Sequence, residues 1–418
     1  MTTHHDCCGP ASAKRPTLTK AEAIAFLLSR VQPIADTETV PTDAALGRVL
    51  AAPVTSAIEV PGWDNSAMDG YAIRHADLAT HHGRLRVAQR IPAGAVGTTL
   101  EPGTAARIFT GAPVPAGADT VVIQEICERS GETVLIPLDC KAGANIRHTG
   151  EDIRAGAEIL APGIRLAPPH LGLAASVGVG ALAVYRQLRV AVLASGDELV
   201  MPGKPLGPGQ IYNSNRFTLI GLLQALGCEV VDLGIVADTL EATTEALIRG
   251  AREADLIVAS GGVSVGEEDH LKPAVERLGT LDLWNIAIRP GKPVAFGQVN
   301  GIPFFGNPGN PVSLFVTFTL FAAPVVRRLQ GMTGDLSPRA IPIRAGFDWP
   351  KPDKRTEFHR VRIQTGADGK PELAIFPSRS SAVLSSVVWA DGLVEIHPEQ
   401  IIQRGDPVDF MAFADLLR

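Results

Sequence analysis

One short stretch of the chain, Ser260–His270, combines three glycines with three consecutive acids. Glycine has no Cβ atom, so its backbone N–H groups can approach a bound anion such as phosphate. Acids at the start of a helix are stabilised by the helix dipole, and their oxygens are the hard ligands that Mg²⁺ prefers. The stretch therefore indicates a phosphate and divalent-cation site, although a tight turn before a charged helix start remains the alternative. The residues concerned are Gly261, Gly262, Gly266, Glu267, Glu268 and Asp269.

The stretch follows Asp255–Ser260, an apolar run with the length of a buried strand. Strand-like and helix-like segments alternate on either side of it, from Arg189 to the apolar run that begins at Val312. This alternation predicts a three-layer α/β domain with a largely parallel sheet, and ligands bind such sheets beyond the carboxyl ends of the strands. We expect the unusual loops to open on that one edge: Ser195–Glu198, Ala237–Thr239, Gly261–Asp269, Arg289–Pro293 and Gly306–Pro311.

Two further parts of the chain have the short, turn-separated apolar runs of β domains. A capping box at Thr19–Glu22 opens an amphipathic helix near the N-terminus. The predicted fold class is α/β plus β, a multidomain chain whose central α/β domain is accompanied by a β-rich insertion domain and a small C-terminal β domain. The predicted divisions are a mobile tail at 1–16, an elongated helical and linker domain at 17–60 and 156–186, the β-rich insertion at 61–155, the α/β domain at 187–336, and the C-terminal β domain at 337–418.

Composition limits the classes of function. A net charge of −6 and a pI near 6.0 argue against a general nucleic-acid-binding protein. Five cysteines without a C-x-x-C pair fit a reducing cytosol, so we expect a cytoplasmic protein. The longest apolar runs, Leu171–Val184 and Val312–Val326, are shorter than the ~18 residues that span a bilayer, so we expect them in the core and expect no membrane partner.

Two segments match known sequence motifs, but the strands and helices expected around them do not fit those motifs. Gly262–Gly266 matches G-x-S-x-G, but two glycines separate the strand from Ser264, and the acids that follow would oppose an oxyanion there. Gly178–Ala183 matches G-x-G-x-x-A, but it precedes a strand instead of following one and opening a helix. We therefore reject a serine hydrolase and a dinucleotide site.

An ordered series of motifs resembles the molybdopterin molybdenumtransferases, the family that includes the C-terminal domain of gephyrin. Each motif is weak alone, and the full series in this order is specific; it covers roughly residues 17–418. The motifs are Asp64–Ala72, Thr110–Pro115, Gly150–Ile153, Ser195–Glu198, Ser260–Gly266, Pro290–Pro293 and Pro308–Pro311.

The resemblance implies an enzyme of molybdenum cofactor biosynthesis, which inserts molybdenum from molybdate into adenylylated molybdopterin and releases AMP with the help of Mg²⁺. It implies a homodimer with sites shared between subunits, and contacts with molybdopterin adenylyltransferase and with a downstream molybdoenzyme or chaperone. Carried over by motif, the catalytic positions are Asp69, Thr110, Asp152 and Glu198, and the metal ligands are Asp238 and Asp269. The substrate-binding positions are Ser195, Gly261, Gly262, Ser264, Gly266, Lys272, Lys292, Pro308 and Pro311.

Two residues depart from the family pattern: Asn307, where an apolar residue is usual, and Ser195, often Thr. Neither removes a ligand group.

The rival enzyme is molybdopterin adenylyltransferase, whose fold resembles residues 187–331, but it would need neither the Asp69 segment nor a C-terminal β domain. A scaffold is the rival outside enzymology, but nothing in the sequence suggests the additional linker and domain of gephyrin's arrangement. Preference for molybdate or tungstate stays open.

Overall fold

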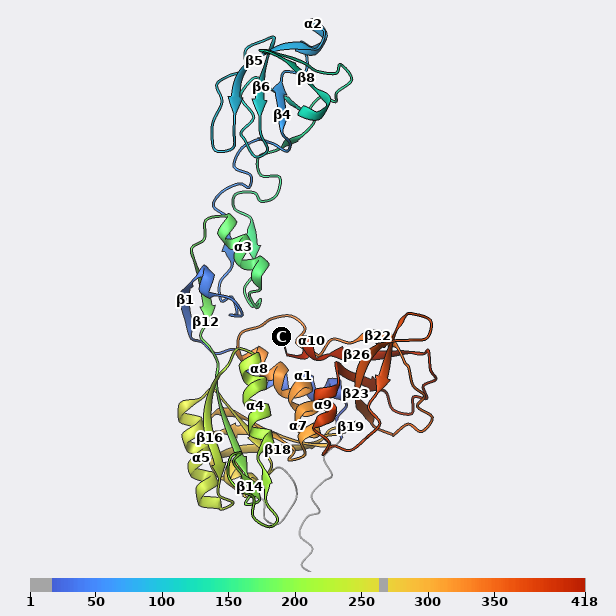
Figure 1. Cartoon of the computed structure of the whole chain (residues 1–418). Helices are drawn as coiled ribbons and strands as arrows, with labels where there is room; N and C mark the ends of the chain where they lie inside the picture. The colour runs from blue at the N-terminus through green and yellow to red at the C-terminus, as the bar shows by residue number, and fades with distance from the viewer. Residues whose placement is uncertain (1–16, 263–269, 418) are drawn as a thin grey trace, which may run out of the picture. The chain divides into compact units, whose positions relative to one another are not determined.

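The computed structural model describes residues 17–262 and 270–417, apart from the side chains of Leu283 and Trp284. The predicted tail and the predicted site residues Ser264, Gly266 and Asp269 lie outside these residues. The chain divides into two compact units (Figure 1). Unit 1 comprises the chain up to Glu38, Gly47–Val49 and Val184–Arg418; unit 2 comprises Thr39–Leu46 and Leu50–Ala183. The finer five-part division remains a prediction.

Unit 1 is built on a six-stranded sheet in the order β16-β13-β17-β21-β20-β18. Its strands are β13 (Arg189–Ser195), β16 (Glu229–Val236), β17 (Leu256–Ser260), β18 (Gly279–Asn285), β20 (Pro293–Val299) and β21 (Ile302–Asn307). The first four in spatial order are parallel, whereas β20 is antiparallel to both of its neighbours. The predicted α/β domain with a largely parallel sheet is confirmed.

The strand register places the predicted loops together. Ser195 pairs with Val236, Ala194 with Ser260, and Ser260 with Asn307, so four strands end level with one another. The connection from β18 to β20 opens on the same edge, because β20 runs back along β21. All five predicted loops therefore leave one edge of the sheet, as expected.

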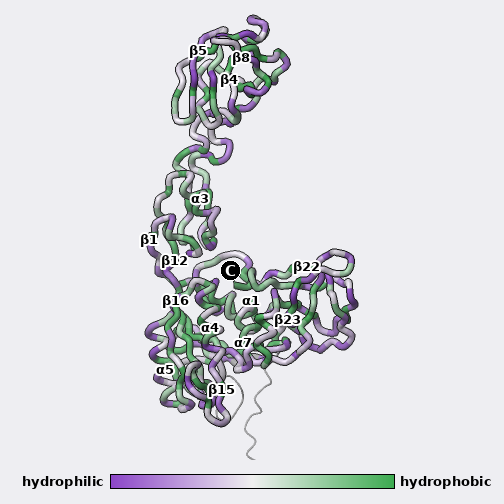
Figure 2. Tube along the Cα trace, viewed as in Figure 1, coloured by the Kyte–Doolittle hydropathy of each residue, from purple (hydrophilic) through white to green (hydrophobic). Residues whose placement is uncertain are grey.

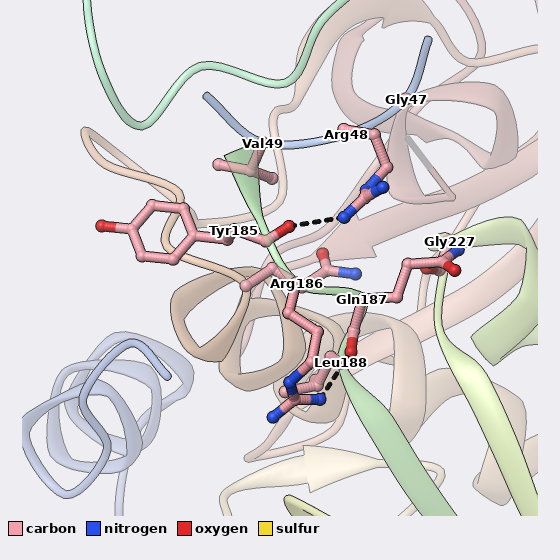
Figure 3. Close-up of a pocket in the computed structure, with 9 residues that line it drawn as sticks. Gly47, Arg48, Val49, Tyr185, Arg186, Gln187, Leu188 and Gly227 are labelled. Atoms are coloured by element: carbon pink, nitrogen blue, oxygen red, sulfur yellow. Dashed lines mark hydrogen bonds between the residues drawn. The ribbon is translucent and has the colours of Figure 1, made fainter. Parts of the chain in front are cut away.

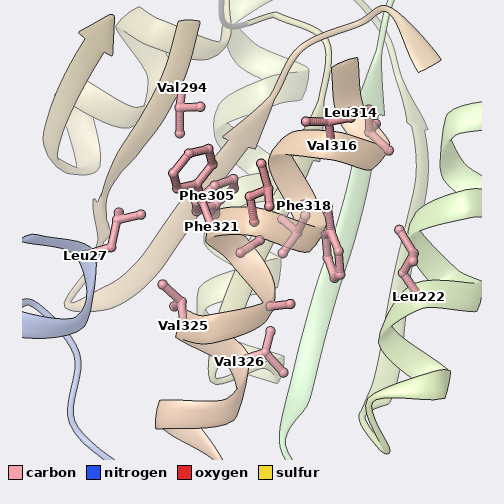
Figure 4. Close-up of a cluster of buried hydrophobic side chains, with 14 of the residues drawn as sticks. Leu27, Leu222, Val294, Phe305, Leu314, Val316, Phe318, Phe321, Val325 and Val326 are labelled. Atoms are coloured by element: carbon pink, nitrogen blue, oxygen red, sulfur yellow. The ribbon is translucent and has the colours of Figure 1, made fainter. Parts of the chain in front are cut away.

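Helices cover both faces of this sheet. The α-helices are the N-terminal helix α1 (Lys20–Ser29) and α4 (Ser214–Ala225), α5 (Leu240–Glu253), α6 (Leu271–Leu278), α7 (Pro311–Thr317) and α8 (Ala323–Leu329). Helix α5 turns Leu247 and Gly250 toward the sheet and is hydrophilic on its outer side (Figure 2). A π-helical segment, Phe318–Ala322, joins α7 to α8. Phe305, Phe318 and Phe321 pack with residues of α1 and α4 in the main core (Figure 4).

The helical run Pro311–Leu329 has 19 residues and is longer than the apolar run Val312–Val326 identified in the sequence. Its length and hydropathy would suffice for a membrane span. However, 94% of its most apolar window is buried inside the unit. It is therefore packed as a core helix, which is the role that its composition predicted.

The C-terminal part of unit 1 is a β domain, again in agreement with prediction. Its sheet has the order β19-β23-β25-β26-β22, with β24 paired to β23. The elements are β19 (Ile288–Arg289), β22 (Ile341–Arg344), β23 (Thr356–Thr365), β24 (Pro371–Ile375), α9 (Ser385–Trp389), β25 (Gly392–Ile396), β26 (Pro407–Ala412) and α10 (Phe413–Leu416). The β-branched run Val383–Trp389 predicts a strand, and this prediction is wrong: Ser385–Trp389 form α9, where Ser386 is buried against β23 and accepts a hydrogen bond from Arg360.

Unit 2 is mostly β, as predicted for the insertion. Its six-stranded sheet has the order β7-β4-β6-β5-β9-β8. Its strands are β4 (Gly70–Ile73), β5 (Arg84–Ile91), β6 (Thr104–Ile108), β7 (Thr120–Ile123), β8 (Glu128–Ser130) and β9 (Thr133–Leu135). Unit 2 also contains β2 (Val54–Thr55), β3 (Asn65–Ser66), α2 (Asp77–Thr80), β10 (Ile146–Arg147), β11 (Glu158–Leu160) and α3 (Pro168–Ser176). Strands β1 (Thr37–Pro41) and β12 (Ala181–Tyr185) cross the division between the two units, and β14 (Leu199–Val200) and β15 (Ile211–Tyr212) lie in unit 1.

Candidate functional site

A cavity of about 370 Å³ lies at the edge of the unit 1 sheet where the parallel strands end. Its volume falls within the ~300–1,000 Å³ usual for small-molecule sites. Four predicted site residues line it: Ser195, Glu198, Gly261 and Pro311. The cavity thus brings together residues from three of the five predicted loops.

Two glycines allow the loops to approach this closely. A Cβ atom on Gly261 would lie 3.1 Å from the Ser195 carbonyl oxygen, and one on Gly309 would lie 3.9 Å from the Cα of Gly261. Gly261 also has φ +83°, a conformation that side chains with a Cβ rarely adopt. Its N–H donates to the carbonyl of Asn307 over 3.2 Å, which links the glycine loop to the end of β21. Gly262 follows in the same left-handed region, at φ +66°.

Acids gather beside Ser195. The Ser195 hydroxyl donates to Oδ1 of Asp238 over 3.2 Å, and the backbone N–H of Asp238 donates to Oδ1 of Asp197 over 3.3 Å. The carboxylate of Glu198 folds back over Gly196, so that a Cβ atom there would lie 2.5 Å from Oε2. Two loops from neighbouring strands thus present three carboxylates, of which Asp197 was not predicted.

These acids offer oxygen ligands for Mg²⁺, but an incomplete set. Among the described residues, no group of three or more His, Cys, Asp and Glu side chains is placed to hold a metal ion. Mg²⁺ commonly keeps several waters and uses one or two carboxylates together with substrate phosphates. Asp238 and Glu198 fit that pattern, and the other predicted ligand, Asp269, lies outside the described residues.

The loop before α7 is fixed by buried polar contacts. Asn307 is fully buried; its Nδ2 donates to the carbonyl of Ala259, and its Oδ1 accepts from the Thr317 hydroxyl over 3.1 Å. A polar residue at this position is therefore satisfied. Pro308 follows, buried and outside the cavity lining. The two predicted lysines, Lys272 and Lys292, are exposed and are not among the described residues that line the cavity.

The start of α4 forms another wall of the cavity, and the sequence did not predict this. Asn213 caps the helix by accepting from the N–H of Arg216, and Asn215 donates through Nδ2 to the carbonyl of Gly309 over 2.6 Å. Both asparagines line the cavity. The letters Asn-Ser-Asn before an apolar period signal a helix cap, but not that the cap faces a site.

The C-terminal β domain also reaches the cavity, through Ala382. The N–H of Val312 in α7 donates to the carbonyl of Ser381 over 3.0 Å. Arg360 of β23 is 1% exposed and donates to the hydroxyl of Ser386 and the carbonyl of Ser378, so it holds this segment in place. Sequence alone gave no indication that a β-strand arginine would be buried here.

Unit 2 holds the other predicted catalytic residues. Oδ1 of Asp69 accepts from both the N–H and the hydroxyl of Thr110, over 2.9 and 2.8 Å. The hydrogen bond from that N–H lowers the pKa of Asp69 below its usual range, so the side chain is a carboxylate at neutral pH. Asp152 is exposed, and its N–H donates to the carbonyl of Val60. Structure therefore joins Asp69 to Thr110, and it places Asp152 on a segment that pairs with residues preceding Asp69.

Asp64 repeats the arrangement of Asp69 with a different loop. Its Oδ1 accepts from the N–H and the hydroxyl of Thr149 over 2.8 and 2.9 Å, and its Oδ2 lies 3.1 Å from Nδ1 of His148. The backbone hydrogen bond again lowers the pKa of the carboxyl group. Asp64, which precedes β3, and Asp69, which follows it, thus each accept two hydrogen bonds from one threonine.

A second hollow in unit 1 contains none of the predicted residues (Figure 3). The guanidinium of Arg48 donates to the carbonyl of Tyr185 over 2.8 Å and forms an ion pair with Glu38. The ring of Tyr185 packs over Gly331, where a Cβ atom would come within 2.3 Å. These contacts stabilise the segments that leave unit 1, and we assign the hollow a structural role.

Comparisons with known proteins agree across the chain. Residues 18–178 match the family described as the MoeA N-terminal region (domain I and II), residues 191–328 a probable molybdopterin binding domain, and residues 342–413 the MoeA C-terminal region (domain IV).

Similar proteins cover nearly the whole chain. A protein named molybdopterin molybdenumtransferase from Haemophilus influenzae is 38% identical over 403 residues, which are 96% of this chain and 100% of that protein. One of the same name from Nostoc is 36% identical over 90% of this chain and 83% of its own length. The crystal structure of the molybdopterin biosynthesis moeA protein from Pyrococcus horikoshii aligns with a TM-score of 0.80 at 27% identity, over 95% of this chain and 100% of that one.

Proposed function

Since this chain belongs to the molybdopterin molybdenumtransferase family, we propose that it inserts molybdenum from molybdate into adenylylated molybdopterin, with Mg²⁺-dependent release of AMP. The observation that carries the proposal is the cavity at the carboxyl edge of the sheet, where Ser195, Glu198 and the Gly261 loop meet beside Asp238. Such an edge is where α/β sheets bind their ligands.

The residues divide the work by their chemistry. The backbone N–H groups of Gly262 and of Ser214 and Asn215 at the start of α4 are suited to phosphate oxygens, because they are uncharged donors, whereas the N–H of Gly261 is already bonded to Asn307. Asp238 and Glu198 would hold Mg²⁺, which supplies positive charge to the bound phosphates. Ser195 positions Asp238 through its hydroxyl.

AMP release is a hydrolysis at the adenylate phosphorus. A water oxygen forms the new P–O bond, and the bond from that phosphorus to the bridging oxygen of the pyrophosphate breaks. The bridging oxygen stays with the molybdopterin phosphate, and AMP departs. Glu198 is also the candidate to accept the water proton, at the carboxylate oxygen that does not hold Mg²⁺, because it is an exposed acid that lines the cavity.

The test is single-turnover AMP release from adenylylated molybdopterin with molybdate, over a range of Mg²⁺ concentrations. Glu198→Gln should lower the rate by about 10²-fold or more, the usual scale for a lost acid–base group. Asp238→Asn should lower the rate most at limiting Mg²⁺, because it removes a metal ligand. Glu245→Gln, an equivalent change at an exposed position on α5, is the matched control. Release by Glu198→Gln and Asp238→Asn at the control rate would remove both residues from the mechanism.

We propose that the protein is a homodimer whose active sites are shared between subunits, and that these sites include Asp69, Thr110 and Asp152. Mixing inactive Asp69→Asn with inactive Glu198→Gln subunits tests this directly. If each site takes Asp69 from one subunit and Glu198 from the other, every mixed dimer has one intact site. Random mixing in equal amounts should then restore about a quarter of wild-type activity. No recovery after subunit exchange, verified by sedimentation, would contradict sharing.

Partners and compartment belong to the same proposal. We propose transfer of substrate from a molybdopterin adenylyltransferase, delivery to a molybdoenzyme or its chaperone, and a cytoplasmic location. An adenylyltransferase activity of this chain is the rival, and ATP consumption with free molybdopterin distinguishes it. A scaffold would bind partners without turnover, so AMP release argues against that class.

A further inference from the structure

Three neighbouring strands of unit 2 reach the same level of the sheet beside Asp69 and Thr110. Strand β4 pairs with β6 and with β7, so that Gly70 lies between Ile108 and Ile123. Asp69 immediately precedes β4, and Thr110 follows the end of β6 by two residues. Both residues therefore lie just beyond the last paired residues of these strands.

The guanidinium of Arg107 bridges the three strands at this level. Its Nη1 atom donates to the carbonyls of Gly70 and Ile108, over 2.8 Å in each case. Its Nη2 atom donates to Oε1 of Gln124, the residue that follows β7. The N–H of Gln124 in turn donates to the carbonyl of Asp69 over 3.0 Å. One half-buried side chain thus links the end of β6, the start of β4 and the residue after β7.

Arg107 also contacts the loop that carries Thr110. Its guanidinium carbon lies 4.3 Å from the centroid of the Phe109 ring, a cation–π contact with the residue immediately before Thr110. The hydrogen bonds from Thr110 lower the pKa of Asp69 most, and the positive charge of Arg107 adds to this effect. The same side chain therefore restrains the backbone next to both members of the Asp69–Thr110 pair and favours the ionised carboxylate.

An arginine is suited to this task, because its planar guanidinium is always charged and presents five N–H donors in a rigid fork. We propose that Arg107 is a positioning residue of the active site, which holds Asp69 and Thr110 in the geometry that molybdenum insertion requires. The inference rests on the proposed function, which assigns Asp69 and Thr110 to the active site. Arg107 acts through these two residues.

The experiment measures single-turnover insertion of molybdenum with adenylylated molybdopterin, molybdate and Mg²⁺, as molybdenum bound per subunit over time. Arg107→Met removes the charge and the hydrogen bonds, whereas Arg107→Lys keeps the charge on a single flexible nitrogen. Gln124→Leu removes one acceptor at an exposed position, so it decides the question if Arg107→Met does not fold. The matched control is Arg90→Met, which removes the other guanidinium over Phe109 and leaves the contacts of Arg107 in place.

Arg107→Met should insert molybdenum about 10²-fold more slowly than wild type, the loss expected when a catalytic group is misplaced by about 1 Å. Arg107→Lys should recover part of this loss. Gln124→Leu should be about tenfold slower than wild type, the scale of one hydrogen bond to a charged group. Because Gln124 acts through Arg107, adding Gln124→Leu to Arg107→Met should slow insertion no further. Arg90→Met should insert molybdenum at the wild-type rate.

The pH profile of insertion distinguishes positioning from a merely structural role. Loss of the Arg107 charge raises the pKa of Asp69 toward its ordinary value. The acid limb of the profile should therefore move to higher pH in Arg107→Met and stay near its wild-type position in Arg107→Lys. Thermal melting of every variant shows that the rates refer to folded protein.

The outcomes that contradict the proposal are distinct. If folded Arg107→Met inserts molybdenum at the wild-type rate, or if it does not fold and Gln124→Leu is as fast as wild type, Arg107 does not position the pair. If insertion slows, the acid limb does not move and the losses from Gln124→Leu and Arg107→Met multiply, then Arg107 only stabilises the fold of unit 2. In both cases the proposed function stands. If wild type itself inserts no molybdenum, the proposed function fails, and the inference with it.

Discussion

Replacing Gly196 with alanine should disable Glu198 while leaving the Glu198 residue itself unchanged. Gly196 has φ +149°, where a residue with a Cβ atom is strained whatever space is available. The new Cβ atom would also lie 2.5 Å from Oε2 and 2.9 Å from both Cδ and Oε1 of Glu198. Real contacts are never this short, so the carboxylate must move away.

Gly196→Ala should have a modest effect on stability and a larger effect on activity. Backbone strain of this kind costs about 1–3 kcal/mol. For a unit of this size, that corresponds to a melting temperature lower by roughly 2–10 °C. The clash itself adds little, because the exposed end of Glu198 can rotate away. Activity should fall further, by about 10²-fold, since a catalytic group misplaced by about 1 Å loses that much.

The assay is a double-mutant cycle on AMP release. If Gly196→Ala acts by displacing Glu198, then Gly196→Ala in the Glu198→Gln background has nothing left to displace. The double variant should therefore release AMP at about the rate of Glu198→Gln alone, while its melting temperature still falls.

Independent effects would refute this reasoning. If the two losses multiply, so that the double variant is about 10²-fold slower than Glu198→Gln, then Gly196 matters for the loop backbone and not for placing the carboxylate. A Gly196→Ala enzyme with wild-type activity would show instead that the position of Glu198 over Gly196 is irrelevant to the reaction.

Other predictions address single residues. Asp69→Asn can keep both bonds from Thr110 through its amide oxygen, so it should melt like wild type yet block molybdenum insertion; Asp64→Asn makes the same change in a matching setting and should retain most activity. Burial lowers the pKa of His359 in the folded protein below its unfolded value of ~6.5. As pH drops from 7 to 5, the unfolded state therefore binds a proton that the folded state does not, and the free energy of unfolding should fall. His359→Gln should reduce this pH dependence of stability, measured by denaturant titrations. Burial raises the pKa of Cys127 to about 11, so at pH 8 only about one thiol in a thousand is ionised, and iodoacetamide should label it far faster in urea than in the native protein.

The sequence predicted the arrangement of the sheet because the relevant signals are local. Apolar runs such as Leu256–Ser260 have the period and length of buried strands, and their alternation with helices leaves few possible topologies. The five loops were assigned to one edge by this topology, and the strand register confirmed it. Contacts of Ser195, Glu198, Gly261 and Pro311 with one cavity follow from that placement.

What the sequence could not predict depends on contacts distant along the chain. The segment Val383–Trp389 has the β-branched composition of a strand, but Ser385–Trp389 form α9, in which Ser386 accepts a hydrogen bond from the buried Arg360. Asn215 meets Gly309 across 94 residues, and no local pattern announces such a pair. Both cases show tertiary packing overriding or adding to local propensity.

The charge of the cavity leads to a final prediction. Among the described residues that line it, Glu198 is charged and none is Lys or Arg, and Asp238 lies one hydrogen bond away from Ser195. An anionic ligand is therefore repelled unless a cation intervenes. At a separation of about 8 Å and an effective dielectric constant of about 40, one unit charge contributes about 1 kcal/mol, or roughly fivefold in affinity.

Glu198→Gln should consequently change the binding of AMP in opposite directions under two conditions. Without Mg²⁺, removing the negative charge relieves repulsion, so the variant should bind AMP about fivefold more tightly than wild type. With saturating Mg²⁺, removing a metal ligand weakens the site, so the variant should bind AMP more weakly. Calorimetry in EDTA and in excess Mg²⁺ measures both arms. A mutation that shifts affinity in the same direction in both buffers would mean that Glu198 does not hold the cation, because only a ligand of the metal reverses its effect on an anion when the metal is present.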